Sequence, residues 1–163
     1  MTNLAADLEK DHHDIDRDLE AFIDRPEEGG PLTSLRKAMD DLRRHIYLEE
    51  VFLFPPLRSA GFIGPVLVML KEHGQMWDVL ARVEGLLGDG RYPDAAETVK
   101  TELFPLLQAH NPKEEQILYP QLDGVLGAAA AAELREFLAQ GVVPDGWTCE
   151  RAGRSQGSTG GMS

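Results

Sequence analysis

Residues 45–57 read HIYLEEVFLFPPL, and residues 110–122 read HNPKEEQILYPQL. The two stretches share a histidine, a pair of glutamates, two leucines and a proline, six identical residues in all, and exchange one phenylalanine for a tyrosine. The preceding segments also match, because KDHHDI at 10–15 lines up with KEHGQM at 71–76. The chain therefore contains an internal repeat, and each copy supplies one single histidine followed by one HxxxE motif.

The hydrophobic residues follow a helical period along nearly the whole chain, and no segment alternates as a β-strand would. Glycine and proline separate five expected helices, at about 4–23, 32–54, 64–87, 94–119 and 127–140. Asp94 and Glu97 form a pattern typical of a helix start, and Pro105 and Pro112 predict kinks in the fourth helix. We expect an all-α fold, an antiparallel up-down four-helix bundle with a pseudo-two-fold internal repeat and a short extra C-terminal helix.

Length and composition set further limits. The 163 residues suit one domain, and we expect the bundle and its fifth helix to occupy residues 1–143, with a flexible Gly/Ser-rich tail at 144–163. Cys149 is the single cysteine, which excludes an internal disulfide and an all-cysteine metal site, and we assign it no role.

The charge balance argues against two classes of partner. Acidic residues outnumber basic ones by 28 to 16, for a net charge of −12, and such a field repels nucleic acid and anionic membrane surfaces. No uninterrupted apolar run is longer than Val66–Leu70, which is too short to span a bilayer. The polar, acidic stretch Met1–Asp11 does not resemble a secretory signal, so a cytoplasmic location is expected.

The repeated histidines fall on the faces that should meet in the core. His45 and Glu49 lie four residues apart, hence on one helix face, and His12 and His73 lie on the apolar stripes of their own helices. Buried charges need partners or a metal. Imidazoles suit iron, copper and zinc, and carboxylates can bridge two ions, so the pattern predicts a metal site inside the bundle.

The order H…HxxxE…H…HxxxE, with EE and an aromatic-proline pair after each motif, resembles the hemerythrin-like (HHE cation-binding) family over about residues 4–123. The resemblance implies a non-haem di-iron centre, with two iron ions joined by carboxylate bridges and an oxo or hydroxo bridge. It also implies the ligands: one iron on His12 and His45, the other on His73 and His110, and bridges from Glu49 and Glu114.

The chain departs from the oxygen carriers of that family at three places. Trp77 stands where they have a fifth histidine, and its repeat equivalent, Asp16, is an alternative ligand or a hydrogen-bond acceptor. The carriers' second carboxylate would correspond to Glu115, whereas the internal repeat favours Glu114. The missing imidazole predicts an open position on one iron, beside Trp77.

Four residues near the expected ligands allow more than one role. His13 could replace His12 as a ligand, although it falls on the polar stripe of its helix. Glu50 and Glu115 are expected to be surface charges or hydrogen-bond acceptors behind the ligands. Tyr119 is expected to pack in the core, with a phenolate ligand as its second possible role.

The resemblance implies a protein that binds or senses oxygen. Two different functions compete with this one: a di-iron redox enzyme that degrades peroxide or nitric oxide, and an iron storage or donation protein. The expected small ligands are dioxygen, peroxide or nitric oxide, and the sequence carries no signal for an oligomeric state.

Overall fold

The computed structural model describes residues 3–154 of the chain, and every regular element in that range is helical. Helix α1 (Leu4–Asp24) begins at Asn3, whose side chain accepts a hydrogen bond from the backbone of Ala6 at 3.3 Å. Helix α2 (Gly30–Leu48) has Pro31 in its first turn, and α4 (Ile63–Gly88) is the longest of these helices. No strand occurs in this part of the chain, as the helical period predicted.

The second expected helix extends further than predicted. Pro55 and Pro56 were expected to end it near Phe54, but α2 passes through a π-helical turn, Glu49–Leu53, into α3 (Phe54–Ser59). A proline inside a helix lacks an N–H and its ring clashes with a carbonyl one turn back. Here the π-helical turn, in which the Phe54 N–H bonds the carbonyl of Glu49 five residues earlier, ends just before the prolines, which then lie in the first turn of α3, where proline is tolerated.

The fourth expected helix is divided in the same way. It comprises α5 (Tyr92–Thr98), a π-helical turn (Val99–Leu103), α6 (Phe104–Lys113), a second π-helical turn (Glu114–Leu118) and a 3₁₀ turn (Tyr119–Gln121). Each π-helical turn ends just before an aromatic-proline pair, at Phe104–Pro105 and at Tyr119–Pro120. The predicted cap at Asp94 is wrong: Arg91 precedes the helix without a side-chain cap, and Asp94 accepts a hydrogen bond from its guanidinium.

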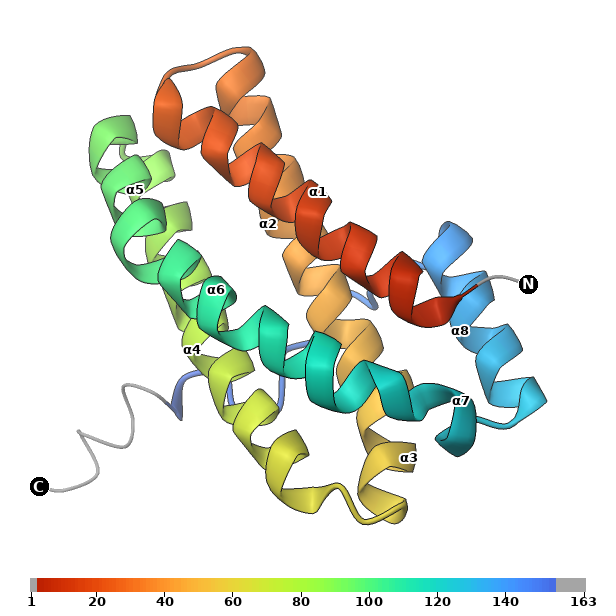
Figure 1. The fold of residues 1–163 in the computed structure, drawn as a ribbon. Helices are drawn as coiled ribbons and strands as arrows, with labels where there is room; N and C mark the ends of the chain where they lie inside the picture. Colours follow the sequence, from red (N-terminus) through yellow and green to blue (C-terminus); the bar gives the residue numbers. More distant parts are fainter. Residues whose placement is uncertain (1–2, 155–163) are drawn as a thin grey trace, which may run out of the picture.

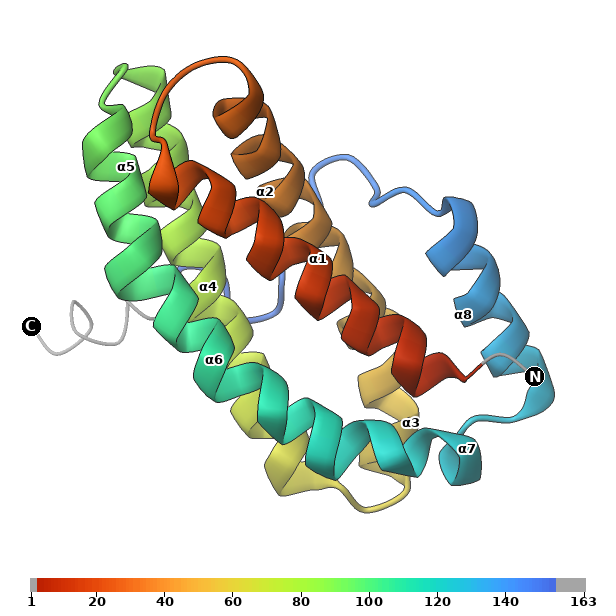
Figure 2. The ribbon, with the colours of Figure 1, turned by 45° about the horizontal axis from the view of Figure 1, so that its top comes forward.

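Figures 1 and 2 show α1, α2, α4 and the stretch from α5 through α6 lying side by side, with α8 (Ala128–Gln140) packed at one end. The short helix α7 (Leu122–Val125) joins α6 to α8. The bundle therefore presents four long helical stretches to a common interior, which is the arrangement that a shared buried site requires.

The interior contains two apolar clusters. One includes Leu19, Phe22 and Leu80, and the other includes Leu8, Leu53 and Leu118. Along each long helix the residues pass from one cluster to the other, and a buried histidine lies at the change. The four helices thus carry a polar layer between two apolar ones.

The described part of the predicted tail, residues 144–154, packs against the bundle. Cys149 is only 3% exposed and belongs to an apolar cluster that Trp147 also contacts. We expected a mobile segment without a role for Cys149, and the difference arises because these two side chains add apolar surface. Gly146 and Gly153, with φ of 80° and 79°, allow the turns that the segment makes. Residues 155–163 of the predicted tail lie outside the described range.

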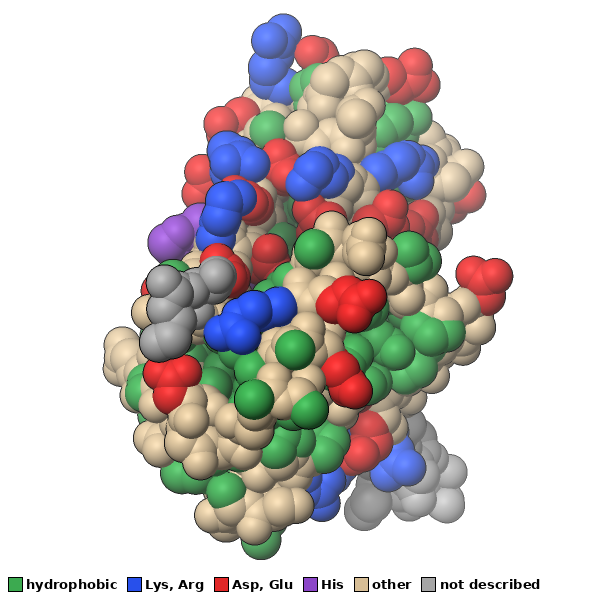
Figure 3. Space-filling model, turned by 90° about the vertical axis from the view of Figure 1, so that its right-hand side faces the viewer, with side chains coloured by type: hydrophobic (Ala, Val, Ile, Leu, Met, Phe, Trp, Pro, Cys, Tyr) green, Lys and Arg blue, Asp and Glu red, His purple; other side chains and the backbone are tan. Residues whose placement is uncertain are grey.

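The surface carries both signs of charge. Figure 3 views the molecule from the side of α8 and shows acidic and basic side chains interspersed over the upper half of that face, with more hydrophobic side chains below. None of the helices of residues 3–154 has the length and apolar character needed to cross a membrane.

Candidate metal centre

Four histidines and two glutamates form the polar layer. His12 comes from α1, His45 from α2, His73 from α4 and His110 from α6, and each is at most 3% exposed. Glu49 and Glu114 begin the two π-helical turns that follow the HxxxE histidines, and both are fully buried. The structure therefore brings together all six residues that the sequence analysis selected: His12, His45, Glu49, His73, His110 and Glu114.

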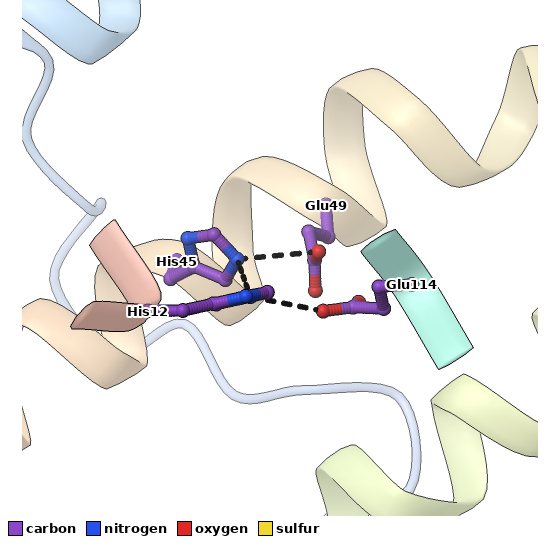
Figure 4. A group of neighbouring side chains, drawn as sticks. All are labelled: His12, His45, Glu49 and Glu114. Atoms are coloured by element: carbon purple, nitrogen blue, oxygen red, sulfur yellow. Dashed lines mark hydrogen bonds and ion pairs between the residues drawn. The ribbon is translucent and has the colours of Figure 1, made fainter. Parts of the chain in front are cut away.

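The six residues form two groups that share both glutamates. The first group is His12, His45, Glu49 and Glu114, and the second is His73, His110, Glu49 and Glu114; within each, one ligand atom per residue lies within 4.8 Å of the others. Figure 4 shows the first group, with the imidazoles of α1 and α2 facing the two carboxylates.

The two oxygens of each carboxylate face different groups. In Glu49, Oε2 lies 3.2 Å from His45 Nε2, and Oε1 lies 3.0 Å from His73 Nε2. In Glu114, Oε1 lies 3.1 Å from His12 Nε2, and Oε2 lies 3.1 Å from His110 Nε2. Each carboxylate is therefore positioned to contact two cations at once, one in each group.

The outer nitrogen of each of these four histidines bonds a carboxylate. The Nδ1 atoms of His12 and His73 lie 2.7 and 2.8 Å from Glu115 and Glu50, respectively. Those of His45 and His110 lie 3.2 and 2.8 Å from Asp11 and Glu72. A carboxylate on Nδ1 fixes the tautomer and the ring orientation, and leaves Nε2 for a metal.

Sequence reasoning missed Asp11 and Glu72. They directly precede His12 and His73 and occupy equivalent positions in the internal repeat. An acidic residue at the same place in both copies was the sequence feature that could have identified them. Glu50 and Glu115 were weighed as acceptors behind the ligands, and their contacts with His73 and His12 agree with that role.

Tyr119 occupies a position that breaks the symmetry of the repeat. Its hydroxyl donates to Glu49 Oε2 at 2.6 Å and lies 3.0 Å from His45 Nε2, 3.2 Å from His12 Nε2 and 3.2 Å from Glu114 Oε1. The repeat equivalent of Tyr119 is Phe54, whose ring stacks on His73 with centroids 5.4 Å apart. The hydroxyl thus lies among the donor atoms of the first group only. The sequence analysis expected Tyr119 to pack in the core, and that role alone does not account for these contacts.

The charged groups of the polar layer shift one another's pKa values. Burial by itself lowers the pKa of His110, but the charge of Glu114, 3.1 Å away, and the hydrogen bond to Glu72 outweigh it and raise that pKa to about 10. Burial likewise opposes ionisation of Glu49, yet the His45 charge and the surrounding hydrogen bonds hold its pKa well below the usual value. A metal cation that binds here must displace imidazole protons, so its affinity must rise with pH.

A buried carboxylate oxygen without a hydrogen bond is a second observation that fits a metal site. Glu114 Oε2 is buried and accepts no hydrogen bond from any described residue, although His110 Nε2 lies 3.1 Å away. Buried carboxylate oxygens are ordinarily paired. An oxygen of this kind, on the side of the second histidine pair, is suited to coordinate a cation.

Two of the residues that competed for a ligand role, His13 and Asp16, lie outside both groups. His13 is exposed on α1, and Asp16 is half-buried and belongs to neither group of donor atoms. Burial raises the pKa of the Asp16 carboxyl. Trp77 packs edge-on against Trp147, with ring centroids 5.5 Å apart, so its packing does not support the expected position beside a metal.

A small cavity of about 10 Å³ adjoins the polar layer. Its walls combine the site histidines with apolar side chains from four helical stretches, and α4 contributes Met76 rather than Trp77. A space of this size holds one water or a molecule of two or three atoms. The other apolar wall residues are Ile15, Leu42, Ile46 and Leu107.

Comparison with known families agrees with this geometry. The model of the hemerythrin HHE cation-binding domain matches residues 3–122, which include all four helical stretches and the six residues of the polar layer. A search of curated proteins found no match, and a search of solved structures found none.

Proposed function

The chain belongs to the hemerythrin HHE cation-binding domain family, and from this premise we propose that it is a non-haem di-iron protein that binds or senses dioxygen. The family and the two buried His/Glu groups indicate metal binding. Beyond metal binding itself, we propose which metal is bound, how many ions there are and which residues are the ligands. His12 and His45 would hold one iron, His73 and His110 the other, and Glu49 and Glu114 would bridge them.

The observation that carries the proposal is the sharing of two glutamates by two histidine pairs. Glu49 and Glu114 face both groups with separate oxygens at 3.0 to 3.2 Å from the imidazoles. Iron ions held by these residues would supply electrons to a small oxidant. The same proposal includes an antiparallel up-down bundle with a pseudo-two-fold axis that relates the two histidine pairs, and a cytoplasmic location.

The chain's own residues determine what reaches such a centre. The cavity beside the histidines has room for only a very small molecule, and Ile15, Leu42 and Met76 give it apolar walls. Dioxygen suits this space because it is small and apolar. The carboxylates behind the histidines hold the imidazoles in place. The Tyr119 hydroxyl, which donates a hydrogen bond to Glu49 Oε2 in the first group, is a source of one proton at that position.

That hydroxyl supports a second candidate, a di-iron redox enzyme acting on peroxide or nitric oxide. Peroxide cleavage requires proton delivery, and Tyr119 places an O–H among the donor atoms of one iron position. An iron storage or donation role is the third candidate, and no contact in the described residues favours it.

The optical spectrum of the iron-loaded protein separates these functions. We expect a band that forms under oxygen and disappears on evacuation, over several cycles. Rapid bleaching with gas release on addition of peroxide would instead support the redox enzyme, and quick loss of iron to a chelator would support storage or donation. His13→Ala is the matched control, because it removes an exposed histidine next to His12 and should leave the spectrum unchanged.

A further inference from the structure

Residues 144–154, which we term the C-terminal strap, reach the polar layer through Glu50. The backbone N–H of Glu150 donates to Glu50 Oε1 at 2.9 Å, while Glu50 Oε2 accepts from His73 Nδ1 at 2.8 Å. Both oxygens of the Glu50 carboxylate are therefore held, one by the strap and one by a histidine of the second group.

The helix under the strap is shaped to receive it. Gly74 directly follows His73, and a Cβ atom added there would lie 2.5 Å from the Arg151 carbonyl oxygen and 2.7 Å from Arg151 Cβ. Real Cβ atoms do not approach other atoms so closely, and the nearest atom belongs to backbone that cannot rotate aside. A glycine is thus required for the strap to pass at this point of α4.

Three further contacts hold the strap in place. Trp147 packs edge-on against Tyr47 and Trp77, with ring centroids 4.9 and 5.5 Å away. Cys149 is buried, and the Gly153 N–H donates to Asp78 at 2.8 Å. The segment is therefore anchored on α2 and α4 by residues on both sides of Glu150.

The internal repeat supplies a comparison within the same molecule. Glu115 is the repeat equivalent of Glu50 and bonds His12 Nδ1 at 2.7 Å. Its side chain is 27% exposed, against 7% for Glu50, and no backbone N–H of the described residues donates to it. The equivalent of Gly74 is His13, which is exposed. One half of the site has a strap and the other lacks it.

We propose that the strap is a positioning element that fixes Glu50 on His73 and makes the His73–His110 half of the centre the more firmly organised one. A carboxylate held on Nδ1 keeps the imidazole in one tautomer and one orientation. Without the strap, Glu50 Oε1 turns to water and the bond to His73 loosens. The proposal rests on the proposed function in one respect only: that the cations bound by the two halves are iron.

Glu150→Pro tests the strap, because proline removes the N–H that bonds Glu50. Glu150→Ala is the matched control, since it keeps that N–H and removes only the exposed side chain. Gly74→Ala is the second variant: it pushes the strap away from α4 while improving helix propensity, so it does not weaken α4 itself.

The first readout is solvent exchange of the imidazole Nδ1 protons of His73 and His12, measured by NMR in chelator-treated protein. We expect Glu150→Pro and Gly74→Ala to accelerate exchange at His73 by about tenfold or more, because the part-buried hydrogen bond between His73 and the charged Glu50 loosens. Exchange at His12 stays unchanged, and Glu150→Ala behaves as the unmodified protein.

The second readout is anaerobic titration with iron(II). We expect one of the two ions to bind about 10- to 100-fold more weakly in Glu150→Pro, as for other losses of support behind a ligand. Unchanged exchange at His73, or equal acceleration at His12 and His73, would overturn the proposal. If the unmodified protein binds no iron, the proposed function fails, and the exchange rates still decide whether the strap positions His73.

Discussion

Replacement of Tyr119 by phenylalanine isolates the one hydroxyl that lies among the donor atoms. The change removes a single oxygen, which donates to Glu49 at 2.6 Å and lies within 3.2 Å of His12, His45 and Glu114. The ring itself fits without it, because Phe54 occupies the equivalent place against His73. The loss of stability therefore reports the hydroxyl contacts rather than a packing defect.

The size of the effect follows from the type of hydrogen bond. Tyr119 is 3% exposed, and a hydrogen bond to a charged group contributes about 1.5 to 3 kcal/mol. We expect the free energy of unfolding of chelator-treated protein to fall by about 2 kcal/mol. For a chain of this length, that corresponds to a melting temperature lower by about 4 to 8 °C.

Thermal unfolding followed by circular dichroism measures this change. Tyr47→Phe is the matched control, because Tyr47 also packs in an aromatic cluster and its hydroxyl makes no hydrogen bond to a described residue. If Tyr119→Phe and Tyr47→Phe melt together, the hydroxyl does not stabilise the polar layer and its place in our account is wrong.

Two other predictions concern the same layer. Glu114→Gln should abolish binding of both iron ions, whereas Glu115→Gln should weaken one of them by about 10- to 100-fold; equal losses in an iron(II) titration would contradict the bridging position of Glu114. Chelator-treated protein should lose stability as pH rises from 6.5 toward 10, because the folded pKa of His110 is raised to about 10 and its protonated form is favoured by folding. Melting temperatures between pH 6 and pH 9.5 measure this, and a flat or rising profile would refute it.

The internal repeat made most of the fold and the candidate site predictable. A four-residue spacing places His45 with Glu49 and His110 with Glu114 whatever the tertiary structure, and the apolar stripes orient those faces inward. The family resemblance that the same residues suggested is confirmed by the family match. The six residues chosen from the sequence are those that the structure gathers, and their role as ligands stays a prediction.

Other features depend on contacts that spacing does not specify. The prolines at 55 and 120 were expected to end helices, but a π-helical turn precedes each of them and the chain stays helical beyond it. The strap was missed because Trp147 and Cys149 are isolated apolar residues in a polar segment, and only Gly74, far away in the sequence, marks where the segment docks.

The most direct test of the central claim is the iron content of protein loaded anaerobically with iron(II), then freed of excess metal. The two groups of donor atoms predict two ions in the unmodified chain, about one in His12→Ala, and none retained in Glu49→Ala, because Glu49 belongs to both groups. A single ion in the unmodified chain, or two ions in Glu49→Ala, would contradict a pair of cations held between two histidine pairs and two shared glutamates.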